Sequence, residues 1–181
     1  HEYIIDFQPI IEQLGMKKWA FGIASEELTT FKYGHFGVFP LAPNPNVTNN
    51  GAFDWSYQTP ASILPSVNEL PTKPLLIVNH PRGSMGYFDQ TGYSRETGKG
   101  QEGLWSDAFG AIEVFNDSDF DANRDGSVGD WFGMLNAGRK MAATGASDSH
   151  HLQTNPLGYP RTCLRIGHDD PQTLTPNAVR D

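Results

Sequence analysis

Two side chains able to bind a divalent metal, Asp148 and His150, stand one residue apart in the stretch "SDSHH" (147–151). A carboxylate and a neutral imidazole are both ligands of zinc, manganese and iron. The same residues are also ordinary polar members of a loop, and so short a pattern is weak evidence by itself. The rest of the chain has to distinguish a metal centre from a polar turn.

Further ligand candidates occur at three other places. Glu26 and Glu27 lie in "ASEELTT", His35 lies in "KYGHFG", and His80 lies in "VNHPRG". Adjacent strand residues point to opposite faces, so at most one of the two glutamates is expected to face a site. The alternatives are solvated glutamates, a tight turn between the glycines that flank His35, and a strand end at His80 before a proline. The chain has a single cysteine, Cys163, so a metal here requires nitrogen and oxygen ligands.

Five short β-prone runs alternate with helical patterns along the chain. We predict strands at 21–25, 36–40, 75–79, 111–115 and 142–146, and helices at 6–15 and 129–140. Strands that alternate with helices indicate parallel βαβ units. Most of the ligand candidates then lie at the carboxyl ends of strands, the edge of an α/β sheet where active sites are built. They are Glu26, Glu27, His80, Asp148 and His150. This shared position favours a metal site over unrelated polar turns.

Length and composition limit the class of protein. The 181 residues, with 38% hydrophobic and 12% aromatic side chains, indicate one domain over residues 1–181. A formal net charge of −8 argues against nucleic acid as a partner. No apolar run approaches the ~20 residues of a membrane span. We therefore expect a soluble protein that acts on a small molecule, and the sequence leaves open whether it is cytoplasmic or exported.

A second kind of metal site is suggested by Asp121, Asn123 and Asp125, which with Gly126 match the opening of a calcium-binding EF-hand loop. The twelfth position of such a loop requires a bidentate glutamate, and Phe132 stands there. An exposed acidic turn is therefore the stronger interpretation, and a calcium ion is the weaker one.

Several stretches, taken together and in order, resemble a known family. They are "SEELTT…GHFGVFP", "LLIVNHPRG", "AIEVFN", "DWFGMLNAGRKMAATGASDSHH" and "GYPRT", and they span nearly the whole chain. The series is similar to the PHP-like metallohydrolases of the CehA/McbA branch, which includes carbaryl hydrolase. The resemblance implies an α/β fold, a distorted (β/α)7 barrel, with up to three zinc, manganese or iron ions at the carboxyl ends of its strands.

The resemblance also implies a set of metal ligands. A bridging glutamate and two histidines hold one ion, an aspartate is a ligand of a second ion, and a histidine is a ligand of a third. Glu27 is similar to the bridging glutamate, and His35 and His80 to the two histidines of the first ion. Asp148 is similar to the ligand of the second ion, and His150 to that of the third. His1 is similar to the histidine of the family's Asp-His motif.

The chain departs from the family at both ends. The family's first strand carries a His-x-His pair and, a little later, an acidic ligand, and residues 1–181 hold no counterpart. We therefore expect a partial domain and an incomplete barrel. Only the site of Glu27, His35 and His80 is complete on this interpretation.

The chemistry implied is hydrolysis. A multi-metal site lowers the pKa of a bound water, so metal-bound hydroxide attacks a phosphoester and no serine or cysteine nucleophile is needed. Arg82 and Arg161 are predicted to bind an anionic group of the substrate, with a salt bridge between loops as the alternative. Glu113 is predicted to hold a ligand histidine in place, or to satisfy interior polarity.

Other functions stay open. The closer one is hydrolysis of carbamates or carboxylic esters, as in carbaryl hydrolase. The other is a non-catalytic, metal-stabilised binding module, or a fragment that forms a homo-oligomer to cover exposed sheet edges. The loop 40–60 carries Phe53, Trp55 and Tyr57, which either line the mouth of the site for an aromatic or sugar-like leaving group or pack the loop against the barrel.

Overall fold

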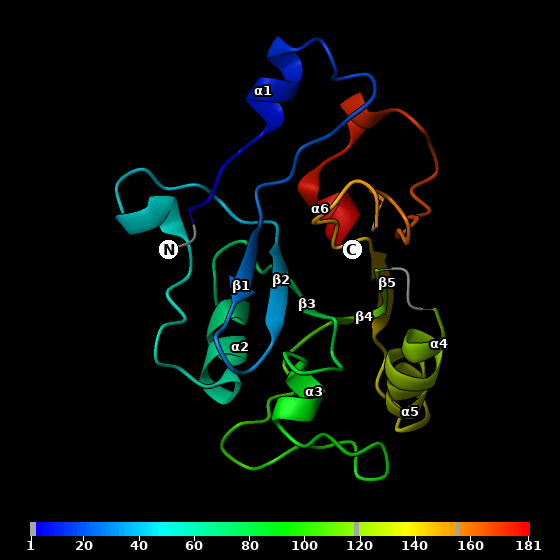
Figure 1. Cartoon of the computed structure of the whole chain (residues 1–181). Coiled ribbons are helices and arrows are strands. Elements are labelled where there is room, and N and C mark those ends of the chain that lie inside the picture. The colour runs from blue at the N-terminus through cyan, green and yellow to red at the C-terminus, as the bar shows by residue number, and fades with distance from the viewer. Residues whose placement is uncertain (1–2, 118–119, 155) are drawn as a thin grey trace.

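A five-stranded mixed sheet forms the centre of the protein (Figure 1). The computed structural model describes residues 3–117, 120–154 and 156–181. The strands follow one another across the sheet in chain order. They are β1 (Glu26–Thr29), β2 (His35–Phe39), β3 (Leu75–Asn79), β4 (Ala111–Asn116) and β5 (Ala142–Ala146).

Short helices surround the sheet. The α-helices are α1 (Gln8–Gln13), α2 (Pro60–Asn68), α3 (Tyr87–Gln90), α4 (Phe120–Asn123), α5 (Gly129–Asn136) and α6 (Pro176–Arg180). Two 3₁₀ turns, η1 (Thr48–Gly51) and η3 (Pro171–Thr173), and one π-helical turn, η2 (Arg124–Val128), complete the set. In the part of the chain that the structure describes, no helix combines the length and the apolarity needed to cross a bilayer.

The sheet has an antiparallel half and a parallel half. β1 pairs with β2, and β2 with β3, in antiparallel ladders, whereas the β3–β4 and β4–β5 pairs are parallel. One edge of the sheet therefore collects the carboxyl ends of β1, β3, β4 and β5 together with the start of β2.

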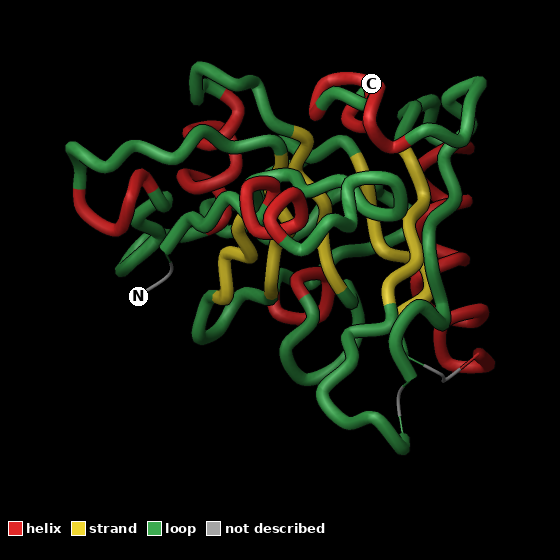
Figure 2. Tube along the Cα trace, turned by 90° about the horizontal axis from the view of Figure 1, so that it is seen from above, coloured by secondary structure: helices red, strands yellow, loops and turns green. Residues whose placement is uncertain are grey.

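The predicted (β/α)7 barrel is wrong. The strands lie in one open row whose outer members are β1 and β5, and the described residues do not close into a barrel (Figure 2). The physical reason lies in the connection between β1 and β2, which is residues 30–34. A parallel pair requires a crossover of about a dozen residues or more, so this short link permits only an antiparallel hairpin.

The individual strands agree better with the sequence than the topology does. The predicted strands at 36–40, 75–79, 111–115 and 142–146 match β2 to β5 within one residue at each end. The strand predicted at 21–25 is wrong, because pairing begins only at Glu26. Both predicted helices exist but are shorter, since 6–15 yields α1 and 129–140 yields α5.

The core lies on one face of the sheet. Alternate residues of β1, β2 and β3 are buried there, and α2 packs against them. Each fully buried side chain of this size contributes about 1.5–3 kcal/mol. The alternation therefore fixes which residues face away from the core. The buried set includes Leu28, Phe36, Val38, Leu76 and Val78 from the strands, and Ile63, Leu64 and Val67 from α2.

The turn between β1 and β2 fixes the start of β2. Thr30 Oγ1 donates to the carbonyl of Gly34 (2.6 Å) and accepts the backbone N–H of Tyr33 (3.0 Å). Gly34 has φ +90°, and a Cβ on it would lie 2.7 Å from the backbone nitrogen of Tyr87 at the start of α3. Only glycine allows this close approach, which holds His35 next to α3.

We expect Gly34→Ala to destabilise the fold more than Gly51→Ala. Both glycines have φ +90°, so both variants carry the same backbone strain of about 1–2 kcal/mol. At Gly51 the nearest atoms to a Cβ are 3.5 Å away, whereas at Gly34 the clash with Tyr87 adds about 1–3 kcal/mol. Urea denaturation of the two variants measures the difference, and equal losses would contradict the close approach at Gly34.

Candidate metal centre

Glu27, His35 and His80 come together at the edge where the strands of the sheet end. Each offers one ligand atom, and these atoms all lie within 4.8 Å of one another. The antiparallel register explains their meeting: His35 pairs with Thr29 on one side and with Asn79 on the other. Glu27 lies two residues before Thr29 and His80 directly follows Asn79, so three segments of the chain meet at one point.

The geometry of the two imidazoles fits one shared ion. His80 Nε2 lies 3.1 Å from His35 Nδ1, and the rings meet edge to face with centroids 4.7 Å apart. Two ligands that each lie ~2.1 Å from one ion are ~3.0 Å apart at an octahedral angle and ~3.4 Å apart at a tetrahedral angle. Glu27 Oε1 lies 3.8 Å from His35 Nδ1, within reach of the same ion after a small side-chain rotation. These residues therefore fit a zinc, manganese or iron ion.

Neighbouring polar groups fix the Glu27 carboxylate. Asn79 Nδ2 donates to Oε1 (2.7 Å) and Thr29 Oγ1 donates to Oε2 (3.0 Å). The residue opposite Glu27 on β2 is Gly37, where a Cβ would lie 3.3 Å from Asn79 Oδ1. The glycine thus leaves the amide room to reach across the sheet. The adjacent Glu26 points the other way, is buried, and accepts the backbone N–H of Phe53 (2.9 Å).

Glu113 holds the backbone of His80 rather than its ring. Its Oε2 accepts the backbone N–H of His80 (2.6 Å) and the side-chain amide of Asn116 (3.0 Å). His80 has φ +25°, in the left-handed region that non-glycine residues rarely adopt, and it precedes Pro81. Strain of this kind persists only where the surroundings hold it, and it gathers at functional sites. The buried carboxylate therefore helps to keep His80 in the orientation that brings its ring to His35.

The charges at this edge favour a cation. Burial lowers the pKa of His35, the neighbouring His80 lowers it further, and the carboxylates of Glu27 and Asp148 oppose the shift. A neutral imidazole is the form that binds metal. Burial also raises the pKa of Glu113 to about 7, and repulsion from Asp148 and Glu27 adds to the shift. A divalent ion would relieve this repulsion.

The other predicted ligands lie at different distances from the centre. Asn116 Nδ2, which binds Glu113, also lies 3.4 Å from Asp148 Oδ2, so Asp148 occupies the same edge. Asp148 has φ +44° and is close enough to affect the pKa of His35. His150 Nδ1 lies 2.7 Å from the carbonyl oxygen of Asp148, and its side chain is 71% exposed. The structure thus groups Glu27, His35 and His80, with Asp148 beside them. The predicted ligand His1 lies outside the described residues.

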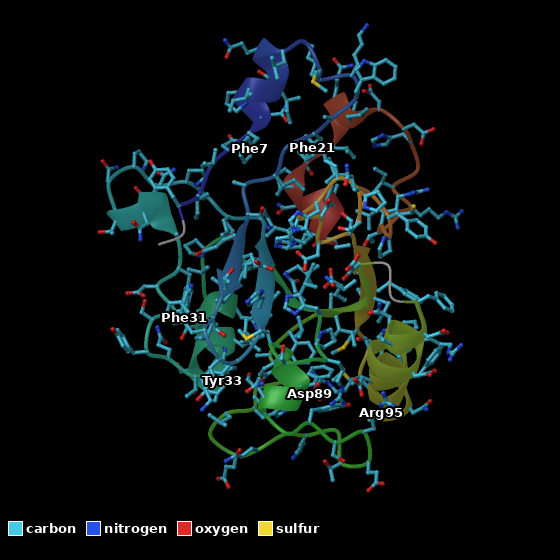
Figure 3. The ribbon with its side chains drawn as sticks, viewed as in Figure 1. Phe7, Phe21, Phe31, Tyr33, Asp89 and Arg95 are labelled. Atoms are coloured by element: carbon cyan, nitrogen blue, oxygen red, sulfur yellow. The ribbon has the colours of Figure 1, made fainter. Side chains whose placement is uncertain are left out.

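Arg82 takes part in an ion-pair network. Its Nε and Nη2 donate to the carboxylate of Asp130 (2.6 and 2.8 Å), and its Nη1 donates to Asp89 (2.6 Å). Asp130, on α5, is fully buried and also accepts from Arg95 Nε (2.6 Å). Figure 3 shows Asp89 and Arg95 below the sheet, from α3 and the loop that follows it. Arg82 therefore forms salt bridges, as in the alternative raised from sequence, but its partners lie on helices, and they anchor the loop that carries His80 to α5 and α3.

Arg161 lies in an exposed segment next to β5. Its Nη1 donates to the carbonyl of Gly158 (3.1 Å), and its backbone lies against Gly145. Its predicted contact with an anionic substrate stays a prediction.

The segment that matches the opening of an EF-hand loop is helical, so neither the predicted acidic turn nor a calcium loop forms there. Residues 120–136 run through α4, η2 and α5 without interruption. Asp121 and Asp125 form ion pairs with Arg124 (3.0 and 2.7 Å). Asn123 donates to the carbonyl of Asn116 (2.8 Å), which ties α4 to the end of β4. The turn that an EF-hand loop needs therefore does not form over these residues.

Three residues of the centre were not predicted from sequence as contacts of the ligands: Asn79, Thr29 and Asn116. Asn79 and Thr29 hold the Glu27 carboxylate, and Asn116 bridges Glu113 and Asp148. The signal that could have found the first two is the period of two along a strand. It places Thr29 on the face of Glu27, and antiparallel pairing adds His35 and Asn79 to that face.

Comparisons of the chain with protein families, with curated proteins and with solved structures found no match.

We expect the protein to bind one divalent ion tightly at Glu27, His35 and His80. Removing one of three ligands should weaken zinc binding at least about 100-fold, more than the 10–100-fold loss typical of changes to groups that merely hold a ligand. Titration against a chromophoric chelator would measure this loss in His80→Ala and Glu27→Gln. The exposed histidine variant His168→Ala is the control. Asp148→Asn should keep this ion, and loss of it in that variant would contradict the three-ligand site.

The raised pKa of Glu113 predicts a pH-dependent stability in the metal-free protein. Since its pKa is about 7 in the folded state and ordinarily 4.5, the folded state binds the extra proton between these values. The stabilisation is therefore complete below about pH 4.5 and is lost as the pH rises through about 7. At ~1.36 kcal/mol per pKa unit, wild type should lose about 3 kcal/mol relative to Glu113→Gln across this window.

Urea unfolding with a chelator present, from pH 4.5 to 8, measures this difference. Glu69→Gln, at an exposed position, is the matched control and should follow wild type. A difference between wild type and Glu113→Gln that stays constant with pH would contradict the shift.

Proposed function

We propose that this protein is a metal-dependent hydrolase whose centre is Glu27, His35 and His80. The observation that carries the proposal is the ligand set: two imidazoles and one carboxylate whose ligand atoms lie within 4.8 Å of one another. Two histidines and a glutamate are the protein ligands of several hydrolytic zinc sites, which keep a fourth position for water or substrate. When bound, the ion supplies a Lewis acid that makes hydroxide available from water near neutral pH.

The residues around the centre have positioning roles in this proposal. Thr29 and Asn79 donate to both oxygens of the Glu27 carboxylate, which keeps it near the two imidazoles and leaves only a small rotation for ion binding. Glu113 holds the backbone of His80, and the Arg82–Asp130 ion pair fixes the loop that continues from it. Pre-set ligands lower the reorganisation needed when the ion and substrate bind.

The reaction proposed is hydrolysis of a small phosphoester, in keeping with the resemblance of the motifs to PHP-like metallohydrolases. The oxygen of water forms a bond to phosphorus, and the bond from phosphorus to the alcohol oxygen breaks. The electron pair of that bond stays on the alcohol oxygen, which takes one proton from the water. The products are the alcohol and phosphate, and no external oxidant or second substrate is needed.

Hydrolysis of a carbamate or carboxylic ester is the second candidate, and the state of the arginines favours it. The donors of Arg82 are directed at Asp130 and Asp89, and Arg161 donates to a backbone carbonyl. A substrate with less negative charge than a phosphoester needs no guanidinium. The oxygen of water forms a bond to the carbonyl carbon, and the bond from that carbon to the alcohol oxygen breaks. The alcohol oxygen takes one proton from the water, and the products are the alcohol and a carboxylic or carbamic acid.

A non-catalytic, metal-stabilised module is the candidate of another class. Large apolar side chains near the N-terminus favour it, because they are exposed and a second copy of the chain would cover them. They include Tyr3, Phe7, Leu14 and Trp19, the last at 82% exposure.

The test is turnover after metal removal and reconstitution with zinc, manganese or iron. The substrates are 4-nitrophenyl phosphate, bis(4-nitrophenyl) phosphate, 4-nitrophenyl acetate and an aryl carbamate. We expect metal-dependent hydrolysis of the phosphoesters and at least a 100-fold loss of kcat/KM in Glu27→Gln and His80→Ala. The controls Glu69→Gln and His168→Ala change the same residue types at exposed positions and should keep full activity.

The other outcomes separate the candidates. Turnover of the acetate or carbamate alone would support the ester hydrolase. A protein that binds metal and hydrolyses none of the four substrates would contradict hydrolysis, and a dimeric mass in size-exclusion chromatography would then support the binding module.

A further inference from the structure

A pocket of about 920 Å³ opens at the end of β1, close in sequence to Glu27. Its walls are the end of β1, the β1–β2 turn and the loop that carries residues 48–57. Thr29 belongs to both places, since it lines the pocket and its Oγ1 lies 3.0 Å from Glu27 Oε2. A volume of this size is typical of small-molecule sites, so a substrate held at the centre can extend into it.

Aromatic rings form part of the wall. Phe31 and Trp55 meet edge to face at 76° with centroids 5.1 Å apart, and together they make a corner. Phe31 is 88% exposed and Tyr57 is fully exposed, with φ +58°. Figure 3 shows Phe31 on the turn, at the outer side of the sheet. Phe31 and Tyr57 are therefore open to a ligand, whereas Trp55 is half-buried and packs with its other side against the core.

Polar groups alternate with the rings. In the run "FDWSY" (53–57), Asp54 and Ser56 separate the three aromatic residues, and all five line the pocket. Asp54 Oδ1 accepts the backbone N–H of Ser56 (3.0 Å). Its carboxylate therefore stands at a fixed place beside the rings and keeps acceptor capacity for a ligand.

This combination selects among ligand classes. Among the described residues, the lining holds no lysine or arginine and one carboxylate, so an anionic group would be repelled there. A wholly apolar aryl group would remove water from Asp54 without replacing its hydrogen bonds, which is unfavourable. A sugar ring presents flat C–H surfaces for the aromatic rings and hydroxyl groups that donate to a carboxylate.

We propose that this pocket binds a sugar as the alcohol part of the ester, with C–H surfaces against Phe31 and Trp55 and hydroxyls toward Asp54. The inference rests on the proposed hydrolase for the position of the ester beside Glu27. Binding of the sugar itself requires only the pocket.

Binding is tested first, with the full chain and without an ester. Methyl glucoside and methyl galactoside are titrated and followed by ligand-observed NMR, with benzyl alcohol as the aryl comparison. We expect at least one glycoside to bind wild type and to bind Asp54→Ala and Trp55→Ala at least tenfold more weakly. Trp19→Phe changes an exposed aromatic residue outside the pocket and should bind like wild type.

Turnover is tested second, with glucose 6-phosphate and glycerol 3-phosphate. In Asp54→Ala and Trp55→Ala the ratio of kcat/KM for the sugar phosphate to that for the glycerol phosphate should fall at least tenfold, through KM rather than kcat. Circular dichroism and metal content check that each variant is folded, and Asp54→Ala serves if Trp55→Ala is not, because Asp54 is exposed.

The two proposals fail in different ways. Glycoside binding without hydrolysis of any ester leaves the sugar pocket standing and contradicts the hydrolase. Hydrolysis with an unchanged substrate ratio and no glycoside binding overturns the sugar pocket alone. Benzyl alcohol that binds in place of glycosides, with no effect of Asp54→Ala, would also overturn it.

Discussion

The candidate centre depends on the antiparallel register of the first three strands. Thr29, His35 and Asn79 lie side by side because β1, β2 and β3 are paired with no bulge between them. A slip of one residue in either pair would turn the ligand side chains toward the core and the core side chains toward solvent. Burial of residues such as Phe36 and Val78 therefore fixes the register, and the same register fixes the ligands. Along β1, β2 and β3, alternate side chains therefore face the core on one side of the sheet and the centre on the other.

Two buried acids show how differently the structure treats charge. Asp130 accepts from two arginines, so its negative charge is paired where it is buried. Glu113 accepts from a backbone N–H and an amide, which carry no charge, and burial raises its pKa. Asp130 fixes a loop by a permanent ion pair. Glu113 lies beside the centre, where a bound metal ion would supply a positive charge close to its carboxylate.

The sequence predicts the parts of this fold better than their arrangement. Strands β2 to β5 can be predicted because apolar, β-branched runs such as "LLIVN" are bounded by turn residues. The residues of a strand do not show whether it pairs parallel or antiparallel with its neighbours. The alternation of strands and helices therefore suggested parallel pairing throughout. The link 30–34 is too short for a crossover, but the strand predicted at 21–25 ended too early and left residues 26–35 as the connection, which hid this signal. His35, which precedes the strand predicted at 36–40, opens β2 and reaches the same edge because β2 runs antiparallel to its neighbours. The partners of the ligands, such as Asn79, become evident only when the register is known.

The spacing of the ligands along the chain has a topological consequence. Glu27 and His35 belong to one hairpin, whereas His80 lies 45 residues beyond His35. An ion that joins them closes a loop which includes α2 and the segment 48–57, as a cross-link would. Closing a loop of this length removes chain entropy on the order of 3 kcal/mol, from ~(3/2)RT ln n. The ion would thus act as a reversible cross-link between His35 and His80. Without the ion, only packing and hydrogen bonds would keep the segment between these residues folded.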